Sequence, residues 1–412
     1  MITLTTQSDA TISAVKIRAV TLGLDLPAPE VVAAPFEAAG RFLSEARRAF
    51  EAAGLEVQTA RAAGADLGQS VGSSPARLKD WASSTEDTAR KSGIEFLSLG
   101  RVPAAAHEFV AESLAPILAA GEIVFFSADL IDGGLPSIAM AKACASAVKQ
   151  LSRTTDLGFG TLRFAATANC PPNIPFLPAA YHSGGSEKFS VAVEAADVVV
   201  EAFSAPGGMS AIEDGLVRRL EEECERVERV ADELVGAHGY AFVGIDLSPA
   251  PFPSDGVSIG GAIEHAGVDR FGAPGTLYVS AMLTRAIRRT RVRRCGFSGL
   301  MLPVLEDSVL AQRAAECPPS LHELLLYSAV CGTGLDTIPV PGDISEAELA
   351  GTYLDVAAMS VALNNKPLTV RLMPVPGAST GDATQFAFDY FANSRVFPMA
   401  GAGASGVLQR GQ

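Results

Sequence analysis

Short apolar runs with strand character alternate with amphipathic helical segments along almost the whole chain, and this alternation limits the fold more than any other feature. The apolar run at 122–127, followed by a helical pattern at 136–151, is a clear example. We expect the other strands at 15–24, 55–59, 94–99, 161–169, 189–203, 240–247, 296–304 and 368–373. Further helices are expected at 30–53, 75–91, 104–120, 210–235, 257–290, 308–316, 319–330 and 345–362. Apolar strands separated by helices of crossover length are typical of a largely parallel sheet, so the pattern predicts an α/β fold.

Nothing in the sequence divides the chain into separate units. No Gly-rich linker, charge block or internal repeat interrupts the 412 residues, and we therefore expect one large α/β domain over 1–412. A barrel and a doubly wound sheet both fit the pattern, and periodicity does not distinguish them. In either fold, ligands bind in loops beyond the carboxyl ends of the strands.

Composition and charge exclude several classes of function. Hydrophobic residues make up 48% of the chain and charged residues 19%, which is ample for a core and unlike a disordered protein. The net charge of −14 argues against a nucleic-acid-binding protein, which needs a basic surface to meet phosphates. Six arginines lie between 285 and 294. They could form an anion-binding patch, but we favour a solvated helix face.

Cysteine usage and hydropathy bear on location. The six cysteines are spread singly, with no CxxC pair, which is typical of a reducing compartment. No cleavable leader pattern and no long uncharged apolar window is present. We therefore expect a soluble, cytoplasmic protein that contacts neither a membrane nor nucleic acid.

Three polar loops follow apolar runs near the C-terminus, at 303–307, 331–343 and 371–382. Such breaks deliver polar groups into concave sites, so we expect one shared pocket. Glu306, Asp307 and Asp336 are predicted catalytic residues, although Glu306 and Asp307 also suit the start of a helix. Arg371 is the predicted carboxylate clamp, because its planar fork binds carboxylates with two hydrogen bonds.

Two further residues of these loops are predicted to bind substrate, namely Cys331 and Asp382. Cys331 has no neighbouring His or Lys to activate its thiol, so inert packing is the better interpretation of that side chain.

Polar residues that follow earlier strands complete the predicted site. His182 and Asp246 are predicted catalytic residues, although a single His is more often a structural hydrogen-bonding group. Predicted substrate-binding residues are Asp129, Asn169, Ser248 and Thr276. Asp129 and Asp132 could equally be turn residues, and the Pro-rich loop after Asp246 could be a plain connector.

Cofactor expectations are limited. No GxxxxGK[ST] and no well-placed GxGxxG occurs, so no nucleotide cofactor is expected. If a divalent metal binds, Asp129, Asp246 and Glu306 are its predicted ligands, because carboxylate oxygens suit such ions.

Several ordered motifs resemble one family. They lie at 18–23, 180–182, 246–251, 297–299, 303–307, 334–336, 370–371 and 381–382 and so cover nearly the whole chain. The chain resembles domain-of-unknown-function family 711, which is grouped with pyruvate formate-lyase-like barrels. The resemblance implies a ten-stranded β/α barrel with a loop threaded inside. It also implies a small ACT-domain protein as a partner, and we expect a homo-oligomer.

Relatives in that superfamily use a thiyl Cys on the inner loop and a glycyl radical near the C-terminus. Cys331 resembles the first feature, but Arg395-Val396-Phe397-Pro398-Met399 lacks the Gly expected two residues after Val. We therefore expect no radical chemistry. The segment 129–134 also departs from the Asn-Ile-Gly-Ser type usual in the family, so a shared substrate does not follow.

Two functions remain open from the sequence. The first is an enzyme of hydrolase or lyase type that acts on a carboxylate, oxo-acid or amino-acid-like molecule by acid–base or metal-assisted chemistry. The alternative is a non-catalytic amino-acid sensor that works with an ACT-domain partner.

Overall fold

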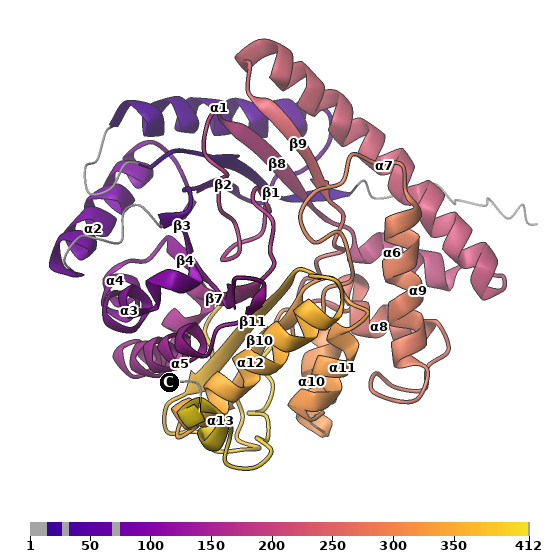
Figure 1. Cartoon of the computed structure of the whole chain (residues 1–412). Coiled ribbons are helices and arrows are strands. Elements are labelled where there is room, and N and C mark those ends of the chain that lie inside the picture. The colour runs from indigo at the N-terminus through magenta and orange to yellow at the C-terminus, as the bar shows by residue number, and fades with distance from the viewer. Residues whose placement is uncertain (1–14, 27–32, 68–74, 318, 411–412) are drawn as a thin grey trace, which may run out of the picture.

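The computed structural model describes residues 15–26, 33–67, 75–317 and 319–410, which form an α/β domain built on one large sheet. Helices lie around the outside of the curved sheet (Figure 1). The nine strands, in chain order, are β1 (Lys16–Gly23), β2 (Ala60–Ala63), β3 (Phe96–Val102), β4 (Val124–Asp129), β7 (Phe164–Ala168), β8 (Lys188–Glu194), β9 (Ala241–Asp246), β10 (Gly334–Pro341) and β11 (Leu368–Val375). Their order across the sheet is β10-β11-β7-β4-β3-β2-β1-β8-β9. The predicted α/β class with a mostly parallel sheet is confirmed.

The sheet contains two sets of strands that run in opposite directions. The central five, β7, β4, β3, β2 and β1, are all parallel. At one side β8 pairs antiparallel with β1, and at the other side β11 pairs antiparallel with β7. Because β9 is parallel to β8 and β10 is parallel to β11, both outer pairs oppose the central five.

One segment touches both edges of this sheet. Arg294 forms a parallel bridge with Ile245 of β9, and Pro303 forms a parallel bridge with Asp336 of β10. The strand predicted at 296–304 is therefore present only as single bridges near its ends. The segment nevertheless links the two outermost strands.

Helices cover the sheet. They are α1 (Ala33–Ala52), α2 (Pro75–Lys91), α3 (His107–Phe109), α4 (Ala115–Ala120), α5 (Ile138–Thr154), α6 (Ala196–Ser204), α7 (Met209–His238), α8 (Ile259–His265), α9 (Thr276–Arg289), α10 (Ser308–Glu316), α11 (Leu321–Ser328), α12 (Glu346–Ala362) and α13 (Ser405–Arg410). The predicted apolar stripe of α7 is buried along its length, from Leu216 to Leu234. The predicted capping box of α12 is also present, since Ser345 and Glu348 exchange hydrogen bonds between side chain and backbone.

Five predictions of elements need correction. The strand expected at 55–59 does not overlap β2, which begins at Ala60. The segment 331–343, expected as a polar loop, contains β10, in which all eight residues are buried. The β-type run at 189–203 divides into β8 and α6. The helical region at 257–290 is two helices, α8 and α9. The helix at 104–120 is interrupted by a π-helical turn at Val110–Leu114.

Four of the six arginines of 285–294 pair with acidic side chains of α7, which does not favour an anion-binding patch. Arg285 and Arg289 bind Glu213 of α7 at 2.5 and 3.0 Å, and Arg291 binds Glu221 at 3.2 Å. Arg293 pairs with Asp232 of the same helix at 3.1 Å. These arginines therefore attach α9 and the segment after it to α7.

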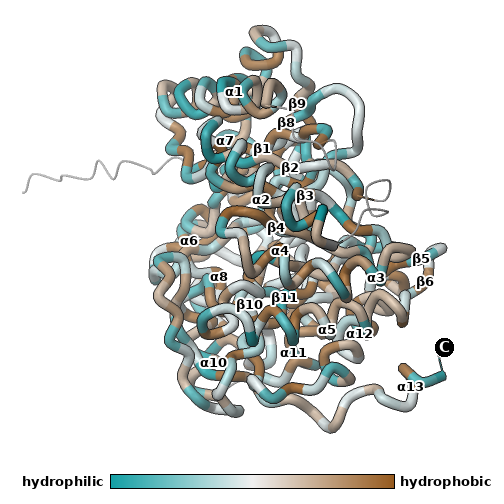
Figure 2. Tube along the Cα trace, turned by 90° about the vertical axis from the view of Figure 1, so that its left-hand side faces the viewer, coloured by the Kyte–Doolittle hydropathy of each residue, from teal (hydrophilic) through white to brown (hydrophobic). Residues whose placement is uncertain are grey.

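Figure 2 shows the short hairpin of β5 (Ile131–Asp132) and β6 (Leu135–Pro136) at the periphery of the molecule. Its tip is exposed, and Leu135 is 66% exposed. Asp132 therefore lies away from the interior. In the described part of the chain, no helix combines the length and apolar composition that a bilayer crossing requires.

Candidate functional site

A cavity of about 360 Å³ opens among the first halves of the strands. Arg18 comes from β1 and Arg61 from β2. Phe96 is the first residue of β3, and Phe125 is the second residue of β4. Asp336 and Arg371 come from the first halves of β10 and β11. We had expected a site beyond the carboxyl ends of the strands, and this cavity is elsewhere. Because the two sets of strands run in opposite directions, their carboxyl ends lie at opposite ends of the sheet and do not form one shared rim.

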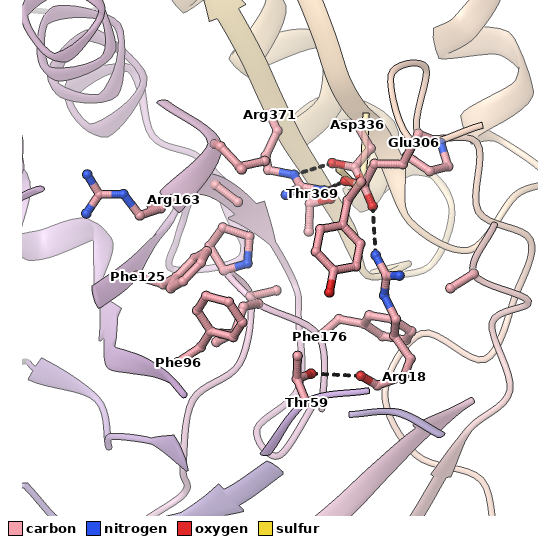
Figure 3. A pocket seen from close by; sticks show the side chains of 18 of the residues that line it. Arg18, Thr59, Phe96, Phe125, Arg163, Phe176, Glu306, Asp336, Thr369 and Arg371 are labelled. Carbon is pink, nitrogen blue, oxygen red and sulfur yellow. Dashed lines mark hydrogen bonds and ion pairs between the residues drawn. The ribbon is translucent and has the colours of Figure 1, made fainter. Parts of the chain in front are cut away.

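A buried ion-pair cluster forms one wall of the cavity (Figure 3). Arg371 donates from Nη2 to Glu306 Oε1 at 2.8 Å and from Nε to Asp336 Oδ1. Arg18 Nη2 donates to the other oxygen of Glu306 at 3.3 Å, and its Nη1 lies 3.5 Å from Glu194 Oε2. Burial opposes the charge of Arg371, but Asp336 and Glu306 together raise its pKa. Burial also raises the pKa of Glu194, against the pull of Arg18.

Glu306 and Asp336 differ in whether a carboxylate oxygen remains free to accept a further hydrogen bond. Both oxygens of Glu306 accept from arginines. Asp336 uses Oδ1 for Arg371, whereas its Oδ2 accepts no hydrogen bond from any described residue. Asp336 therefore presents an unused acceptor in the cavity.

Arg61 forms no ion pair with the acidic side chains that the structure describes. Its Nε donates to Thr59 Oγ1 at 2.8 Å, and its Cζ lies 5.8 Å from the centre of the Phe96 ring. Within the described ranges it forms no ion pair. Burial lowers the pKa of Arg61 to about 9, and the positive charge of Arg18 adds to this effect, while the negative charges of Glu306 and Glu95 oppose it. An anion placed against Arg61 would relieve both costs.

Arg163 also lines the cavity, but its guanidinium is hydrogen-bonded to backbone carbonyl groups. It donates to the carbonyl oxygens of Leu118 at 2.5 Å and Val124 at 3.4 Å. Figure 3 shows its side chain pointing away from the ion-pair cluster. Arg61 is thus the better candidate for binding an anion.

Aromatic rings form the opposite wall. Phe96 and Phe125 meet edge to face, with ring centres 5.7 Å apart, across the cavity from Arg18 and Glu306 (Figure 3). Other aromatic residues at the cavity are Phe159, Phe176, Phe297, Phe388 and Tyr390. The cavity therefore has one charged and one apolar side, which suits a small amphipathic molecule.

Three of the residues predicted from the sequence meet here, namely Glu306, Asp336 and Arg371. Arg371, predicted as the carboxylate clamp, already holds Glu306 and Asp336. The others do not line this cavity: His182, Asp246, Asp307, Asp129, Asn169, Ser248, Thr276, Cys331 and Asp382.

Asp246 and Ser248 stabilise a turn. The fully buried Asp246 carboxylate accepts from the Ser248 hydroxyl at 2.7 Å and from the backbone N–H groups of Ser248, Phe297 and Ser298. Burial raises the pKa of Asp246, and these hydrogen bonds oppose the rise. The pair connects the end of β9 to the segment that bridges the sheet edges.

Asp307 caps two helices at once. One oxygen accepts from the N–H groups of Val309 and Leu310 in α10, and the other accepts from Ile259 and Gly260 in α8. Asp307 is therefore a helix N-terminal residue, which is the alternative that the sequence also allows for it. Its position explains why it is buried far from solvent.

His182, Asp129 and Asn169 lie near the carboxyl ends of the central strands. The buried His182 ring is 3.2 Å from Asn173 Oδ1 and packs on Gly23, where a Cβ would come within 2.4 Å of the ring. Asp129 pairs with Arg101 at 3.0 Å, and its pKa is raised by burial. Asn169 donates to the Ser360 hydroxyl at 2.8 Å.

The remaining predicted residues have local contacts. Thr276 donates to the Ala273 carbonyl at 2.8 Å at the start of α9. Cys331 is buried, as inert packing predicts. Asp382 is exposed and accepts from the Ser379 N–H at 2.8 Å.

The predicted metal ligands do not come together. Asp129, Asp246 and Glu306 have the separate partners described above. Over residues 15–26, 33–67, 75–317 and 319–410, no group of three or more His, Cys, Asp or Glu side chains could hold a metal ion.

Comparison with known proteins agrees with the motifs. A family model described as "Uncharacterised ACR (DUF711)" matches residues 11–393. The chain belongs to the DUF711 family. Relatives named UPF0210 protein occur in Pyrobaculum arsenaticum, 39% identical over 53% of this chain and 51% of theirs, and in Methanopyrus kandleri, 35% identical over 58% and 54%. One from Clostridium beijerinckii is 31% identical over 63% and 60%. The matches thus span about half the length of these relatives.

Sequence reasoning missed two features of this DUF711 site. It did not select Arg61, and it did not select the aromatic wall of Phe96 and Phe125. The signal for Arg61 is a single charged residue inside an apolar strand, Ala60-Arg61-Ala62-Ala63. A charge in that setting is costly to bury, so it marks a residue with a partner or a ligand.

Proposed function

We propose that this DUF711 chain binds a small organic carboxylate in the cavity and acts on it by acid–base chemistry. The observation that supports this most is Arg61, a partly buried guanidinium in the cavity that forms no ion pair with any described residue. A bound carboxylate would form charge-assisted hydrogen bonds with it. The apolar wall would hold the rest of the ligand.

Asp336 is the proposed proton-transfer residue. Both oxygens of Glu306 already accept from arginines, so this carboxylate has no oxygen free for a proton of the ligand. Asp336 keeps one oxygen free to take a proton from the ligand and to return it to the product. The reaction we propose is of hydrolase or lyase type and uses these side chains. A metal-assisted form has no donor cluster within the described residues.

We further propose that the sheet closes as a ten-stranded barrel of the pyruvate formate-lyase type. The segment from Arg294 to Pro303 would be the tenth strand, since it bridges β9 at one end and β10 at the other. Two sets of five strands in opposite directions would then surround the cavity. A cytoplasmic location also stays a proposal, in agreement with six free cysteines.

The test uses a carboxylate and its neutral analogue. Calorimetric titration of the full chain with 3-phenylpropanoate should show binding, whereas 3-phenylpropanamide should not bind. Arg61→Gln should weaken 3-phenylpropanoate binding about tenfold to a hundredfold, because a hydrogen bond to a charged group contributes about 1.5–3 kcal/mol. Arg48→Gln is the matched control, since Arg48 is exposed on α1.

Equal affinity of the wild type and Arg61→Gln for 3-phenylpropanoate would contradict the proposed binding mode. Once a natural ligand is found, NMR of the recovered ligand separates turnover from plain binding.

A non-catalytic sensor is the second candidate, and one observation favours it. Glu306 is fully engaged by arginines, as expected in a rigid binding site rather than a reacting one. In that case the ligand is returned unchanged, and the proposed ACT-domain partner or a second copy of the chain would respond to binding.

A further inference from the structure

The charged groups that line the cavity are of both signs. They are Arg18, Arg61, Arg163 and Arg371, together with Glu122, Glu306 and Asp336. Uncompensated buried charge is costly. A ligand that carries one charge of each sign can compensate groups of both kinds.

The free polar atoms of the cavity point to the same conclusion. The terminal nitrogens of Arg61 donate to no described residue, and Asp336 Oδ2 accepts from none. The terminal nitrogens of Arg61 can bind an anion, and Asp336 Oδ2 can accept from a charged N–H donor. Both residues line one cavity, so one molecule can meet both.

We infer that the ligand is a zwitterion, with one carboxylate, one ammonium group and an apolar body, as in an amino acid with a large apolar side chain. The carboxylate binds Arg61, the ammonium group binds Asp336 Oδ2, and the body packs against Phe96 and Phe125. This inference rests on the proposed function, because it adds a second charge to the carboxylate proposed there and makes the ammonium group the part of the ligand from which Asp336 can take a proton.

The size of the cavity fits such a molecule. A volume of about 360 Å³ corresponds to about a dozen water molecules at ~30 Å³ each. This space can accommodate a ligand of about a dozen non-hydrogen atoms, the size of phenylalanine. Seven aromatic residues at the cavity favour an aromatic or branched apolar body.

Three probes of the same shape test the inference. Calorimetric titration of the full chain at pH 7 compares L-phenylalanine, 3-phenylpropanoate, which lacks the ammonium group, and 2-phenylethylamine, which lacks the carboxylate. L-Phenylalanine should bind about tenfold or more tightly than either of the others, because each charged hydrogen bond contributes about 1.5–3 kcal/mol.

Variants assign the two charges. Asp336→Asn should remove the preference for L-phenylalanine over 3-phenylpropanoate and leave 3-phenylpropanoate binding nearly unchanged. Arg61→Gln should weaken both. Asp132→Asn, at the exposed tip of the β5–β6 hairpin, should behave like the wild type.

The outcomes separate the two proposals. If wild-type protein binds 3-phenylpropanoate as tightly as L-phenylalanine, the zwitterion is wrong and the carboxylate site stands. If neither carboxylate probe binds, the proposed function fails with it. Because the first comparison uses only the wild type, it holds even if Asp336→Asn does not fold.

Discussion

At the scale of single residues, the informative positions are charges inside apolar strands. Glu306 and Arg371 could be predicted because each is near a Pro-rich or Gly-rich break that directs polar groups inward. Arg61 has no such neighbour and was missed. The role of Arg371 could not be read from its own loop, because Glu306 is 65 residues away and Asp336 is 35 residues away in the sequence. Which partner an arginine meets is decided by pairing between distant strands.

Asp307 gives a prediction at this scale. Asp307→Ala should lower the free energy of unfolding by about 2–4 kcal/mol, because one substitution removes the N-cap of α10 and two further hydrogen bonds to the first turn of α8. Ser345→Ala is the control, since it removes one exposed cap from α12 and should cost about 1 kcal/mol. Urea denaturation measures both. Equal losses in the two variants would show that Asp307 does not stabilise two helices.

At the scale of elements, the sequence predicted most helices and failed where local and global signals disagree. β10 contains Gly334, Pro339 and Pro341, which are typical of a loop. Proline is tolerated there because β10 is the last strand in the sheet order, where an N–H is not needed on the outer side. The segment Ala196–Ser204 is rich in valine, a strand former, yet it is helix α6. Its packing against α7 and α8 outweighs that preference.

We expect the contact between α7 and α9 to weaken at low pH. Hydrogen bonds from Arg285, and then from Arg289, lower the pKa of Glu213. A lowered folded pKa means that the stabilisation is present above the ordinary pKa of a glutamate and is lost as pH falls through the folded value. Glu213→Gln should therefore be less stable than the wild type at pH 7, with a difference that shrinks below about pH 4.

Thermal unfolding from pH 7 to pH 3 measures this difference. Glu222→Gln is the matched control on the same helix, because Glu222 is exposed and its ion pair with Arg218 is long, at 4.0 Å. A difference between wild type and Glu213→Gln that stays constant over this range would show that the ion pair is not its cause.

At the scale of the whole molecule, the α/β class followed from the alternation of strands and helices, but the direction of the strands did not. The reversal arises where β8 pairs with β1 and where β11 pairs with β7, and both contacts join residues far apart in the sequence. No local pattern reports such pairing. Because of this reversal, the carboxyl ends of the two sets of strands do not meet. The cavity lies among the first halves of the strands, away from Asp129, Asn169 and His182, and much of the predicted site is therefore outside it.

The central claim is that Arg61 holds the carboxylate of a small amphipathic ligand inside this cavity. A crystal structure of the protein soaked with L-phenylalanine tests it most directly. We predict density in the cavity, with the carboxylate within hydrogen-bonding distance of Arg61 and the ring against Phe96 and Phe125. Density with the carboxylate on another residue, or a ligand bound near His182 and Asp129 with this cavity empty, would contradict the claim.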